Sequence, residues 1–539
     1  MQKKYMSEVI GTEYREWGNG KVIISAQTGR GKSQFIMEEA IPWWLYNDKK
    51  VLILVNRRSL WKQYIYDEAL VYDRYVTNLR IATYQEYAKE IMKSGSLIGA
   101  FLKYDIVVMD EAHFFISDSD FNPEDTYIVW QAVFHSCDQC MIFMSATLEE
   151  LQPFLSEYEI YIKSHSKGNE GSRSKFWKYS IEADYDYVMP EIIPDSETLI
   201  AIISKSAKKS VIFINDIAQG KEMRNQIKSI DKEKKVVCLD ASSMDCLNQE
   251  EKRIMESLYM ANKVECDVLI TTSVLDNGVS IHDSEVENIV IFTNSKSSFL
   301  QMLGRVRTED TEKLRLLMIP CLPTFWEQCE QILDEEVKEI DRLTEGKHYK
   351  YECSFLCKAF LNASRMLGLY KKIFVMLPDN EEFSIYDGEE HFVMTYTGRE
   401  KLVINRLAVA KIKQMLQVVR RMNVLSRRNA EEACYEQLSW IDKDRDSVIN
   451  VASTYLEEEE RKMLECFLEV QDYDKEMFSK WKKEFAKKFK NSCLKNLNID
   501  SGKPIKASDL TKILEKEGLQ LISELNKDRR NRYTIKKIQ

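Results

Sequence analysis

Short apolar runs recur in two separate parts of the chain, with stretches of amphipathic helical pattern between them. Such runs are typical of strands buried on both faces of a parallel sheet. Two regions of this kind predict two α/β lobes. The expected strands are Val22–Ser25, Val51–Val55, Ile106–Met109 and Met141–Met144 in the first lobe, and Val211–Ile214, Val236–Leu239, Val268–Ile270 and Ile289–Phe292 in the second.

The pattern changes at two points along the chain. Residues 164–174 are polar and rich in glycine and serine, which indicates an exposed loop near the lobe junction. After about residue 345, short strand-like runs at Ile373–Met376, Phe383–Tyr386 and His391–Thr397 predict a small β meander. We therefore expect lobe 1 in residues 1–163, a linker in 164–195, lobe 2 in 196–345, a small β-rich element in 346–399 and a mainly helical basic region in 400–539.

Composition adds a charge asymmetry to this picture. The 539 residues are 44% apolar, so each lobe can bury a core, and the net charge of −9 argues against a protein that coats nucleic acid over its whole surface. Residues 391–539 nevertheless hold 31 Lys or Arg against 23 Asp or Glu, a net of +8, which leaves −17 for the rest. A basic end on an acidic body points to a polyanionic partner.

The sequence contains no apolar run near the roughly 18 residues of a membrane span, and no signal-peptide pattern. We therefore expect a cytoplasmic protein with no membrane partner, in which the twelve cysteines are thiols. Cys137 and Cys140 form a C-x-x-C, but the second ligand pair of a structural zinc site is not evident.

A glycine-rich loop follows the first expected strand. Residues 26–33, Ala-Gln-Thr-Gly-Arg-Gly-Lys-Ser, lie between that strand and a helical stretch, which is the context of a phosphate-binding loop. Thr28, Gly29 and Gly31 would aim backbone N–H groups at a phosphate cluster. Lys32 would neutralise the β- and γ-phosphates, and the Ser33 hydroxyl would ligate Mg²⁺. The alternative is an ordinary turn that matches by chance.

The expected strand Ile106–Met109 ends in a pair of acids, in the box Asp-Glu-Ala-His. Asp110 is placed to hold Mg²⁺ through a water, and Glu111 can polarise an attacking water as general base. His113 completes the box and is grouped with the nucleotide-binding residues. A strand that merely ends in solvated acids is the alternative.

Beyond these two motifs, the chain resembles the superfamily 2 helicases. Ser145-Ala-Thr147 resembles motif III, which couples the ATP site to nucleic acid in that family. Leu54–Leu60 resembles motif Ia, Ala82–Gln85 the next backbone-contacting segment, Val211–Asn215 motif IV, Val268–Ile281 motif V and Gln301–Arg307 motif VI. The resemblance implies an α/β fold of two tandem RecA-like P-loop lobes. The acidic body and basic end also loosely resemble small helicases of bacterial phages or mobile elements.

Motif VI implies catalytic residues from lobe 2. Arg305 stands at the first arginine finger of the family, with Gln301 at the start of the motif. The second finger usually follows three residues later, where this sequence has Thr308, so Arg307 is the nearest candidate. Either arginine could instead form a surface ion pair.

The other motifs imply contacts with nucleotide and nucleic acid. In motif V, Thr272 or Thr271 would donate to a nucleic-acid phosphate, and Gly278 and Asp276 would lie near ATP. The threonines could equally reflect strand preference. The further calls are Arg57, Arg58 and Thr83 for the nucleic-acid backbone, and Ser145 and Thr147 for coupling.

Two regions stay ambiguous in the sequence. Tyr14 or Trp17 could stack on the base of the nucleotide or lie in a core. Phe478, Trp481, Phe485 and Phe489 lie on one face of an expected lysine-rich helix, which suits either phosphate-backbone binding or ordinary packing, and packing is favoured. The basic run 529–537 is a candidate for disorder until it binds.

The sequence thus predicts nucleic-acid-stimulated ATP hydrolysis with Mg²⁺, which drives movement along, or unwinding of, single-stranded or duplex nucleic acid, with DNA favoured over RNA. Two alternatives stay open. The chain could be the motor subunit of a multi-protein restriction, defence or mobile-element replication complex, with a partner protein at its C-terminal region. It could also be a non-processive ATP-gated clamp.

Overall fold

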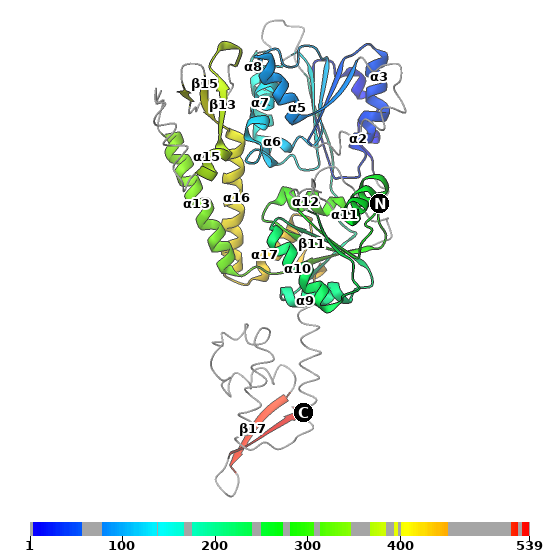
Figure 1. Cartoon of the computed structure of the whole chain (residues 1–539), viewed down its shortest axis with the longest axis vertical. Helices are drawn as coiled ribbons and strands as arrows, with labels where there is room; N and C mark the ends of the chain where they lie inside the picture. Colours follow the sequence, from blue (N-terminus) through cyan, green and yellow to red (C-terminus); the bar gives the residue numbers. More distant parts are fainter. Residues whose placement is uncertain are drawn as a thin grey trace. The chain divides into compact units, whose positions relative to one another are not determined.

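Two parallel sheets lie at the centres of the two expected lobes, as the computed structural model shows (Figure 1). The structure describes residues 4–56, 78–136, 138–165, 175–239, 249–272, 281–306, 313–345, 367–383, 393–396, 400–450, 519–525 and 531–537. The chain forms two units, the first of Met1–Pro190 with Glu197–Val448, and the second of Glu191–Ser196 with Ile449–Gln539. Both lobes therefore belong almost entirely to the first unit.

The sheet of lobe 1 has six strands in the order β3-β2-β4-β5-β1-β6. Its strands are β1 (Lys21–Ala26), β2 (Val51–Val55), β3 (Leu79–Thr83), β4 (Ile106–Met109), β5 (Cys140–Ser145) and β6 (Phe176–Ile181), and every pairing is parallel. All four strands expected in this lobe are confirmed. Because the strands are parallel, their carboxyl ends share one edge, where β1, β5 and β4 are neighbours.

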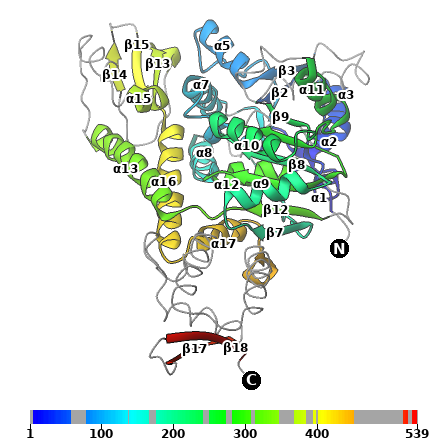
Figure 2. The ribbon, with the colours of Figure 1, turned by 60° about the horizontal axis from the view of Figure 1, so that its bottom comes forward.

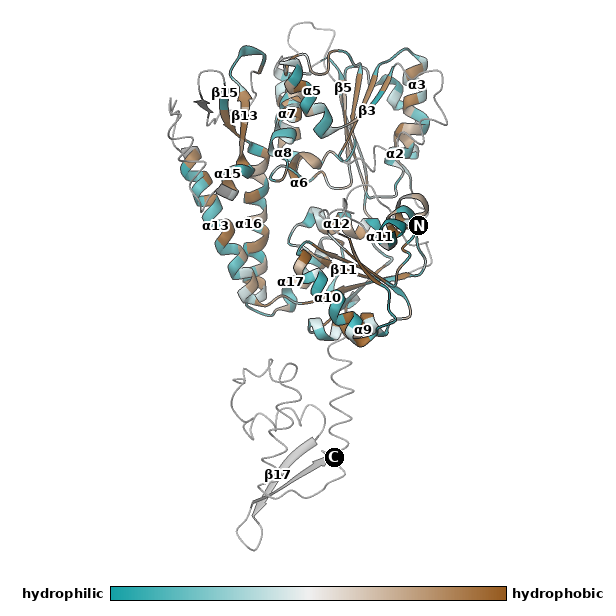
Figure 3. Cartoon of the chain, viewed as in Figure 1, coloured by the Kyte–Doolittle hydropathy of each residue, from teal (hydrophilic) through white to brown (hydrophobic). Residues whose placement is uncertain are grey.

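Alternate side chains of these strands enter two different cores. Val22 and Ile24 of β1 pack with one set of helices, whereas Ile23, between them, packs on the opposite face. The helices beside Val22 include α1 (Met6–Ile10), α2 (Lys32–Phe35), the π-helical turn η2 (Ile36–Ala40) and α3 (Ile41–Tyr46). Those beside Ile23 include α5 (Tyr84–Ser94), α6 (Phe114–Ser117), α7 (Pro123–Phe134) and α8 (Gln152–His165). Brown, hydrophobic residues are accordingly prominent along the strands in Figure 3.

The sheet of lobe 2 has the order β16-β7-β12-β11-β8-β10-β9. Its strands are β7 (Val188–Ile192), β8 (Lys209–Ile214), β9 (Val236–Leu239), β10 (Val268–Thr271), β11 (Val286–Phe292), β12 (Leu314–Met318) and β16 (Ile449–Asn450). The helices of this lobe are α9 (Ser196–Lys205), α10 (Ile217–Ile230), α11 (Gln249–Ala261) and α12 (Lys296–Arg305). All four strands expected in lobe 2 are confirmed as well.

The stretch expected as a linker contributes a strand to each sheet. Within 164–195, β6 pairs with β1 of lobe 1, and β7 joins the sheet of lobe 2. The expectation of a linker over the whole stretch was therefore too broad. Polar residues or proline interrupt its apolar positions, at Lys178 and Ser180 in β6 and at Pro190 and Glu191 in β7, so this stretch lacks the continuous apolar run that marked the central strands.

Beyond lobe 2 the chain adds helices and a small sheet. The helices are α13 (Pro323–Glu345), α15 (Leu367–Ile373), α16 (Arg406–Ser426) and α17 (Glu431–Ser439). Of these, α15 and α16 contact lobe 1, as does the small sheet. Figures 1 and 2 both show α13 alongside α16, and the two helices share an apolar core. Val375, Val403 and Leu407 join the core of lobe 1 beside α7. Every residue of α7 from Thr126 to Phe134 is consequently buried, because the helix is covered on all sides.

The small sheet differs in part from the expected meander. Its strands are β13 (Phe374–Pro378), β15 (Glu400–Ile404) and β14 (Val393–Tyr396), in the order β13-β15-β14 and antiparallel. Phe383 belongs to a short 3-10 turn, η4 (Glu381–Phe383), rather than to the expected strand Phe383–Tyr386, whose remainder lies outside the described residues. The third strand is instead Glu400–Ile404, which the sequence had assigned to the start of the helical region.

The C-terminal tail contains a hairpin rather than the disorder that its basic composition suggested. β17 (Leu519–Leu525) pairs antiparallel with β18 (Asn531–Lys537), and the alternation of Tyr533 and Ile535 with polar residues is typical of a strand. The predicted aromatic and lysine-rich helix at 475–495 lies outside the described residues. Among the described helices, none is long and apolar enough to cross a membrane.

Candidate functional site

The glycine-rich loop connects β1 to α2 at the carboxyl edge of the lobe 1 sheet. Gly29 and Gly31 have φ values of 87° and 76°, in the left-handed region that favours glycine. The turn directs Lys32 back over the loop, where its Nζ donates to the carbonyl of Ala26 at 2.5 Å and to that of Gln27 at 3.4 Å. The ammonium group is thus buried at the centre of the loop.

The loop is supported by the segment that follows β6, which the sequence did not single out. The Gln27 side chain donates to the carbonyl of Asp184 at 3.1 Å and accepts from its N–H at 2.9 Å. Arg30 lies 3.6 Å from the Asp184 carboxylate, measured from a guanidinium nitrogen to a carboxylate oxygen. These contacts hold the loop through Gln27 and Arg30. Ser33 remains directed toward Asp110 at the end of β4.

The two acids of the box begin where β4 ends. Ser33 Oγ donates to Asp110 Oδ2 at 3.4 Å, and the backbone N–H of Glu111 donates to Asp110 Oδ1 at 3.0 Å. Glu111 itself has φ 51°, a conformation that costs a non-glycine residue about 1–3 kcal/mol. The backbone bond from Ala112 to Met144 of β5, at 2.8 Å, helps to hold this strained turn. Asp110 and Glu111 therefore point to different neighbours.

Glu111 is an ionised carboxylate in a largely buried position, with a side chain that is 13% exposed. Burial by itself disfavours the charge, but a hydrogen bond from His113 and the nearby charges of His113, Arg305 and Lys32 outweigh it. Together they hold the pKa of Glu111 well below its usual range. A carboxylate that stays unprotonated at neutral pH is suited to accept a proton or to orient a water molecule.

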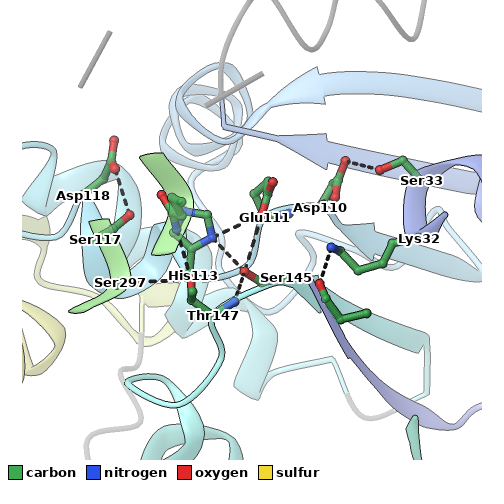
Figure 4. A network of polar contacts seen from close by, with 12 residues as sticks. Lys32, Ser33, Asp110, Glu111, His113, Ser117, Asp118, Ser145, Thr147 and Ser297 are labelled. Atoms are coloured by element: carbon green, nitrogen blue, oxygen red, sulfur yellow. Dashed lines mark hydrogen bonds and ion pairs between the residues drawn. The ribbon is translucent and has the colours of Figure 1, made fainter. Parts of the chain in front are cut away.

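Motif III follows β5, the strand between β1 and β4, so its hydroxyls lie beside the acids (Figure 4). His113 Nδ1 lies 2.9 Å from Ser145 Oγ and 3.4 Å from Glu111 Oε2, and Ser145 Oγ donates to the same Glu111 oxygen at 3.4 Å. Ser145 also accepts from the N–H of Thr147 at 3.1 Å. The box and motif III are thus one hydrogen-bonded network.

Helix α12 of lobe 2 closes the site from the other side. Ser297 Oγ and Gln301 Nε2 both lie 3.1 Å from Thr147 Oγ1, which joins motif VI to motif III. Arg305, at the last residue of the helix, is buried, and a guanidinium nitrogen lies 3.7 Å from Glu111 Oε1. Glu111 and Arg305, 194 positions apart in the sequence, therefore meet across the lobes.

One glycine permits this approach between the lobes. A Cβ atom at Gly304 would lie 3.2 Å from Thr28 Oγ1 of the phosphate-binding loop, which is tighter than ordinary contact. The glycine at position 304 therefore lets helix α12 lie against the loop without a shift of the Thr28 side chain.

Comparison with known families identifies the two lobes separately. The model for DEAD/DEAH box helicases matches residues 1–154, and the model for the helicase conserved C-terminal domain matches residues 195–308. The chain is a superfamily 2 helicase of the DEAD/DEAH type. Helicases with these two domains hydrolyse ATP, so the chain is an ATP-hydrolysing enzyme.

Solved structures with a similar backbone include two helicases of low sequence identity. S. cerevisiae Dbp5 bound to RNA and ADP BeF3 is 16% identical, with a TM-score of 0.39 over 56% of this chain and 79% of Dbp5. The E. coli DExH-box NTPase HrpB is 16% identical, with a TM-score of 0.41 over 61% of this chain and 42% of HrpB. No curated protein sequence matches this helicase. The family assignment therefore rests on the two domain matches.

Of the remaining predicted residues of the helicase, three threonines are described by the structure and five residues are not. Thr83 ends β3, and its hydroxyl accepts from the N–H of Glu86 at 3.1 Å, so it caps α5. Thr271 is buried within β10, whereas Thr272 follows the strand and is only half-buried, which favours Thr272 for an external contact. The other predicted residues lie outside the described part of the chain: Arg57, Arg58, Asp276, Gly278 and Arg307.

The two aromatic candidates for base stacking are core residues. Tyr14 and Trp17 are 5% and 1% exposed, and both pack edge-on against Phe35 of α2. The choice that the sequence left open is therefore decided in favour of the core. The spacing of these residues could not decide it, because a buried and a base-stacking aromatic look alike in a sequence.

Proposed function

We propose that this helicase hydrolyses ATP where lobes 1 and 2 meet, and that closing and opening of the lobes move it along nucleic acid or separate its strands. The contact of Arg305 with Glu111 carries the proposal, because it places a cation from one lobe beside the acid of the other. A cation delivered in this way stabilises charge on the transferred phosphoryl group and increases the rate about 10³–10⁵-fold in other enzymes.

Each residue of the site has a proposed role. Lys32 exchanges the loop carbonyls for the β- and γ-phosphates, while Thr28, Gly29 and Gly31 shape the loop around them. Glu111 accepts a proton from the attacking water and is oriented by His113 and Ser145. Gln301 and Thr147 hold the lobes together. The nucleotide contacts of His113, Gly278 and Asp276, and a catalytic role of Arg307, remain predictions.

Ser33 and Asp110 fit a magnesium ion. A hydroxyl and a carboxylate face one another from the loop and the end of β4, with 3.4 Å between their oxygens, and Mg²⁺ prefers such hard oxygen ligands. A bound ion would supply charge neutralisation for the phosphates. The two side chains would hold it, with the remaining positions left for substrate oxygens and water.

For the nucleic acid, we propose contacts at the carboxyl ends of strands in both lobes. Thr272 follows β10, and Arg57 and Arg58 follow β2 in the sequence, where cations and hydroxyls suit a phosphate backbone. Thr83 is buried as a helix cap and is therefore less accessible than Thr272. We favour DNA over RNA as the substrate, and a cytoplasmic location for the reaction.

Nucleic-acid stimulation tests this function most directly. ATPase rates of the purified chain are measured against titrated single-stranded and duplex DNA and RNA at two salt concentrations, with Lys32→Ala as background control. We expect stimulation that weakens as salt increases, because backbone contacts release counterions. ATP turnover that no nucleic acid changes would refute the proposed coupling. Strand displacement from 3′-tailed, 5′-tailed and blunt duplexes then separates a moving helicase from an ATP-gated clamp.

A further inference from the structure

The first turn of helix α5 places a buried tyrosine beside the acids of the box. Tyr84 is the first residue of this helix and is fully buried, and its hydroxyl donates to the backbone carbonyl of Asp110 at 3.0 Å. In the sequence, Tyr84 belongs to the segment Ala82–Gln85, which resembles a backbone-contacting segment of the superfamily 2 helicases. Its side chain instead reaches the ATP site, at the residue that follows β4.

The ring of Tyr84 is held by two aromatic residues that follow the box. It stacks on Phe114 of α6, with 4.5 Å between the ring centroids and an interplanar angle of 11°, and it meets Phe115 edge-on at 5.3 Å. Both phenylalanines are fully buried, so the packed ring gives the hydroxyl a fixed direction. Burial and the charges of Asp110 and Glu111 raise the pKa of Tyr84, so the hydroxyl keeps its proton and can donate.

The bond from Tyr84 acts on the peptide group that precedes the strained residue of the box. The carbonyl of Asp110 and the N–H of Glu111 belong to one planar peptide. Tyr84 holds the carbonyl, and Asp110 Oδ1 accepts from the N–H at 3.0 Å. The φ of Glu111, 51°, is a rotation measured from this peptide, so a fixed peptide helps to fix the direction of the Glu111 side chain. A strained conformation of this kind persists only where surrounding contacts hold it.

We propose that Tyr84 is a positioning residue for ATP hydrolysis, whose hydroxyl holds the peptide between Asp110 and Glu111. The Glu111 carboxylate is thereby kept beside His113 and Arg305, where it can orient the attacking water. Because the hydroxyl holds a backbone carbonyl of the site, it should act on the hydrolysis step rather than on the binding of ATP. The inference rests on the proposed role of Glu111 as the group that activates water.

The same helix offers a matched control. Tyr87, three residues further along α5, is also buried, and its hydroxyl donates to the backbone carbonyl of Ala100 at 2.5 Å. Its ring stacks on Phe101, with 5.3 Å between the centroids. Tyr84 and Tyr87 thus share a helix, burial, a stacked ring and a bond to a backbone carbonyl. They differ in that only the carbonyl bound by Tyr84 belongs to the box.

The test compares Tyr84→Phe with Tyr87→Phe, each of which removes one hydroxyl and keeps the ring. The full chain is assayed for kcat and KM for ATP at saturating nucleic acid. For Tyr84→Phe we expect kcat to fall about tenfold while KM changes less than about twofold, because the base is displaced and the phosphate loop is unchanged. Tyr87→Phe should change kcat less than about twofold. Both variants should lower the denaturation midpoint by similar amounts, since each loses one buried hydrogen bond.

A double variant connects the effect to the base. In a Glu111→Gln background, whose residual rate is followed in single turnovers, Tyr84→Phe should lower the rate less than about twofold further. Equal losses of kcat in the two tyrosine variants, an unchanged kcat in Tyr84→Phe, a rise in KM that matches the fall in kcat, or a full tenfold loss in the Glu111→Gln background would overturn the inference. Near-normal hydrolysis by Glu111→Gln alone would instead refute the role of Glu111 on which the inference rests.

Discussion

The two halves of the hydrolytic site are built differently. The lobe 1 half comes from neighbouring parallel strands, with Lys32 after β1, Asp110 after β4 and Ser145 at the end of β5, so one sheet fixes its geometry. The lobe 2 half consists of Arg305 on α12, a helix that contacts the other lobe through Thr147. The first half is therefore preformed, whereas the second exists only when the lobes are together.

This difference indicates where hydrolysis can be controlled. Substitutions in the lobe 1 half should affect ATP binding or the hydrolysis step whether or not the lobes are closed. Changes at α12 should act on the catalytic rate with little effect on the binding of ATP, because Arg305 does not contribute to the loop around Lys32. Four predictions sharpen this contrast, from the largest expected effect to the smallest.

Replacement of Lys32 by alanine should abolish ATP turnover, since the loop then has no cation for the β- and γ-phosphates. Steady-state phosphate release from the purified variant measures the effect, with circular dichroism as the check that the lobes are folded. Turnover near the wild-type rate in a folded Lys32→Ala chain would remove Lys32 from the phosphate site.

The variant Glu111→Gln should leave ATP bound but hardly hydrolysed. The amide keeps the shape of the side chain and cannot accept a proton, and loss of one general base typically costs about 10²–10⁴-fold in rate. Equilibrium binding of a fluorescent ATP analogue, measured together with single-turnover hydrolysis, separates the two effects. Near-normal hydrolysis would show that another group activates the water.

For Arg305→Ala we expect kcat to fall by about 10³-fold, at the lower end of the range known for arginine fingers, with a nearly unchanged KM for ATP. The structural contrast requires this split between kcat and KM, since Arg305 faces Glu111 and not the loop around Lys32. If KM rises as much as kcat falls, the arginine contributes to ground-state binding and the two halves are not distinct.

The smallest effect is expected where the C-terminal region is attached to lobe 1 at its surface. Arg406 makes two hydrogen bonds to Glu157, at 3.0 and 3.1 Å, but both side chains are partly exposed. Arg406→Ala should therefore lower the free energy of unfolding by about 1 kcal/mol or less, and leave kcat unchanged. Chemical denaturation and ATPase assays on the same preparation test both parts. A large loss of kcat would show that the contact between Arg406 and Glu157 contributes to catalysis.

The central strands could be predicted from sequence because each is a continuous apolar run, and all eight are present. Two of the strands that were missed, β3 and β6, have mixed polar and apolar positions and lie at the edges of the lobe 1 sheet, whereas β7 and β12 were missed although they lie inside the lobe 2 sheet. The sequence around Thr83 contains a helix-capping pattern that our sequence interpretation overlooked. The pattern Thr83-x-x-Glu86 is a capping box, which indicates a helix cap rather than a free hydroxyl.

The site was predictable to the extent that its residues follow strands in short motifs. Ser297 was missed because nothing in its local sequence indicates a contact with Thr147, 150 positions away. The complete burial of α7 was also invisible, since its cover comes from residues near 375 and 403. The apolar pattern of a helix indicates that one face is buried, but it does not indicate which distant segment covers that face.

The sequence by itself determined the two lobes, the phosphate-binding loop and the acids of the box, because each depends on residues that are close together in the chain. Only the tertiary structure decided that Tyr14 and Trp17 are core residues, that Arg305 meets Glu111, and that Thr147 contacts α12. The physical reason is that these features depend on how distant elements pack, and packing distances are not encoded in any local periodicity.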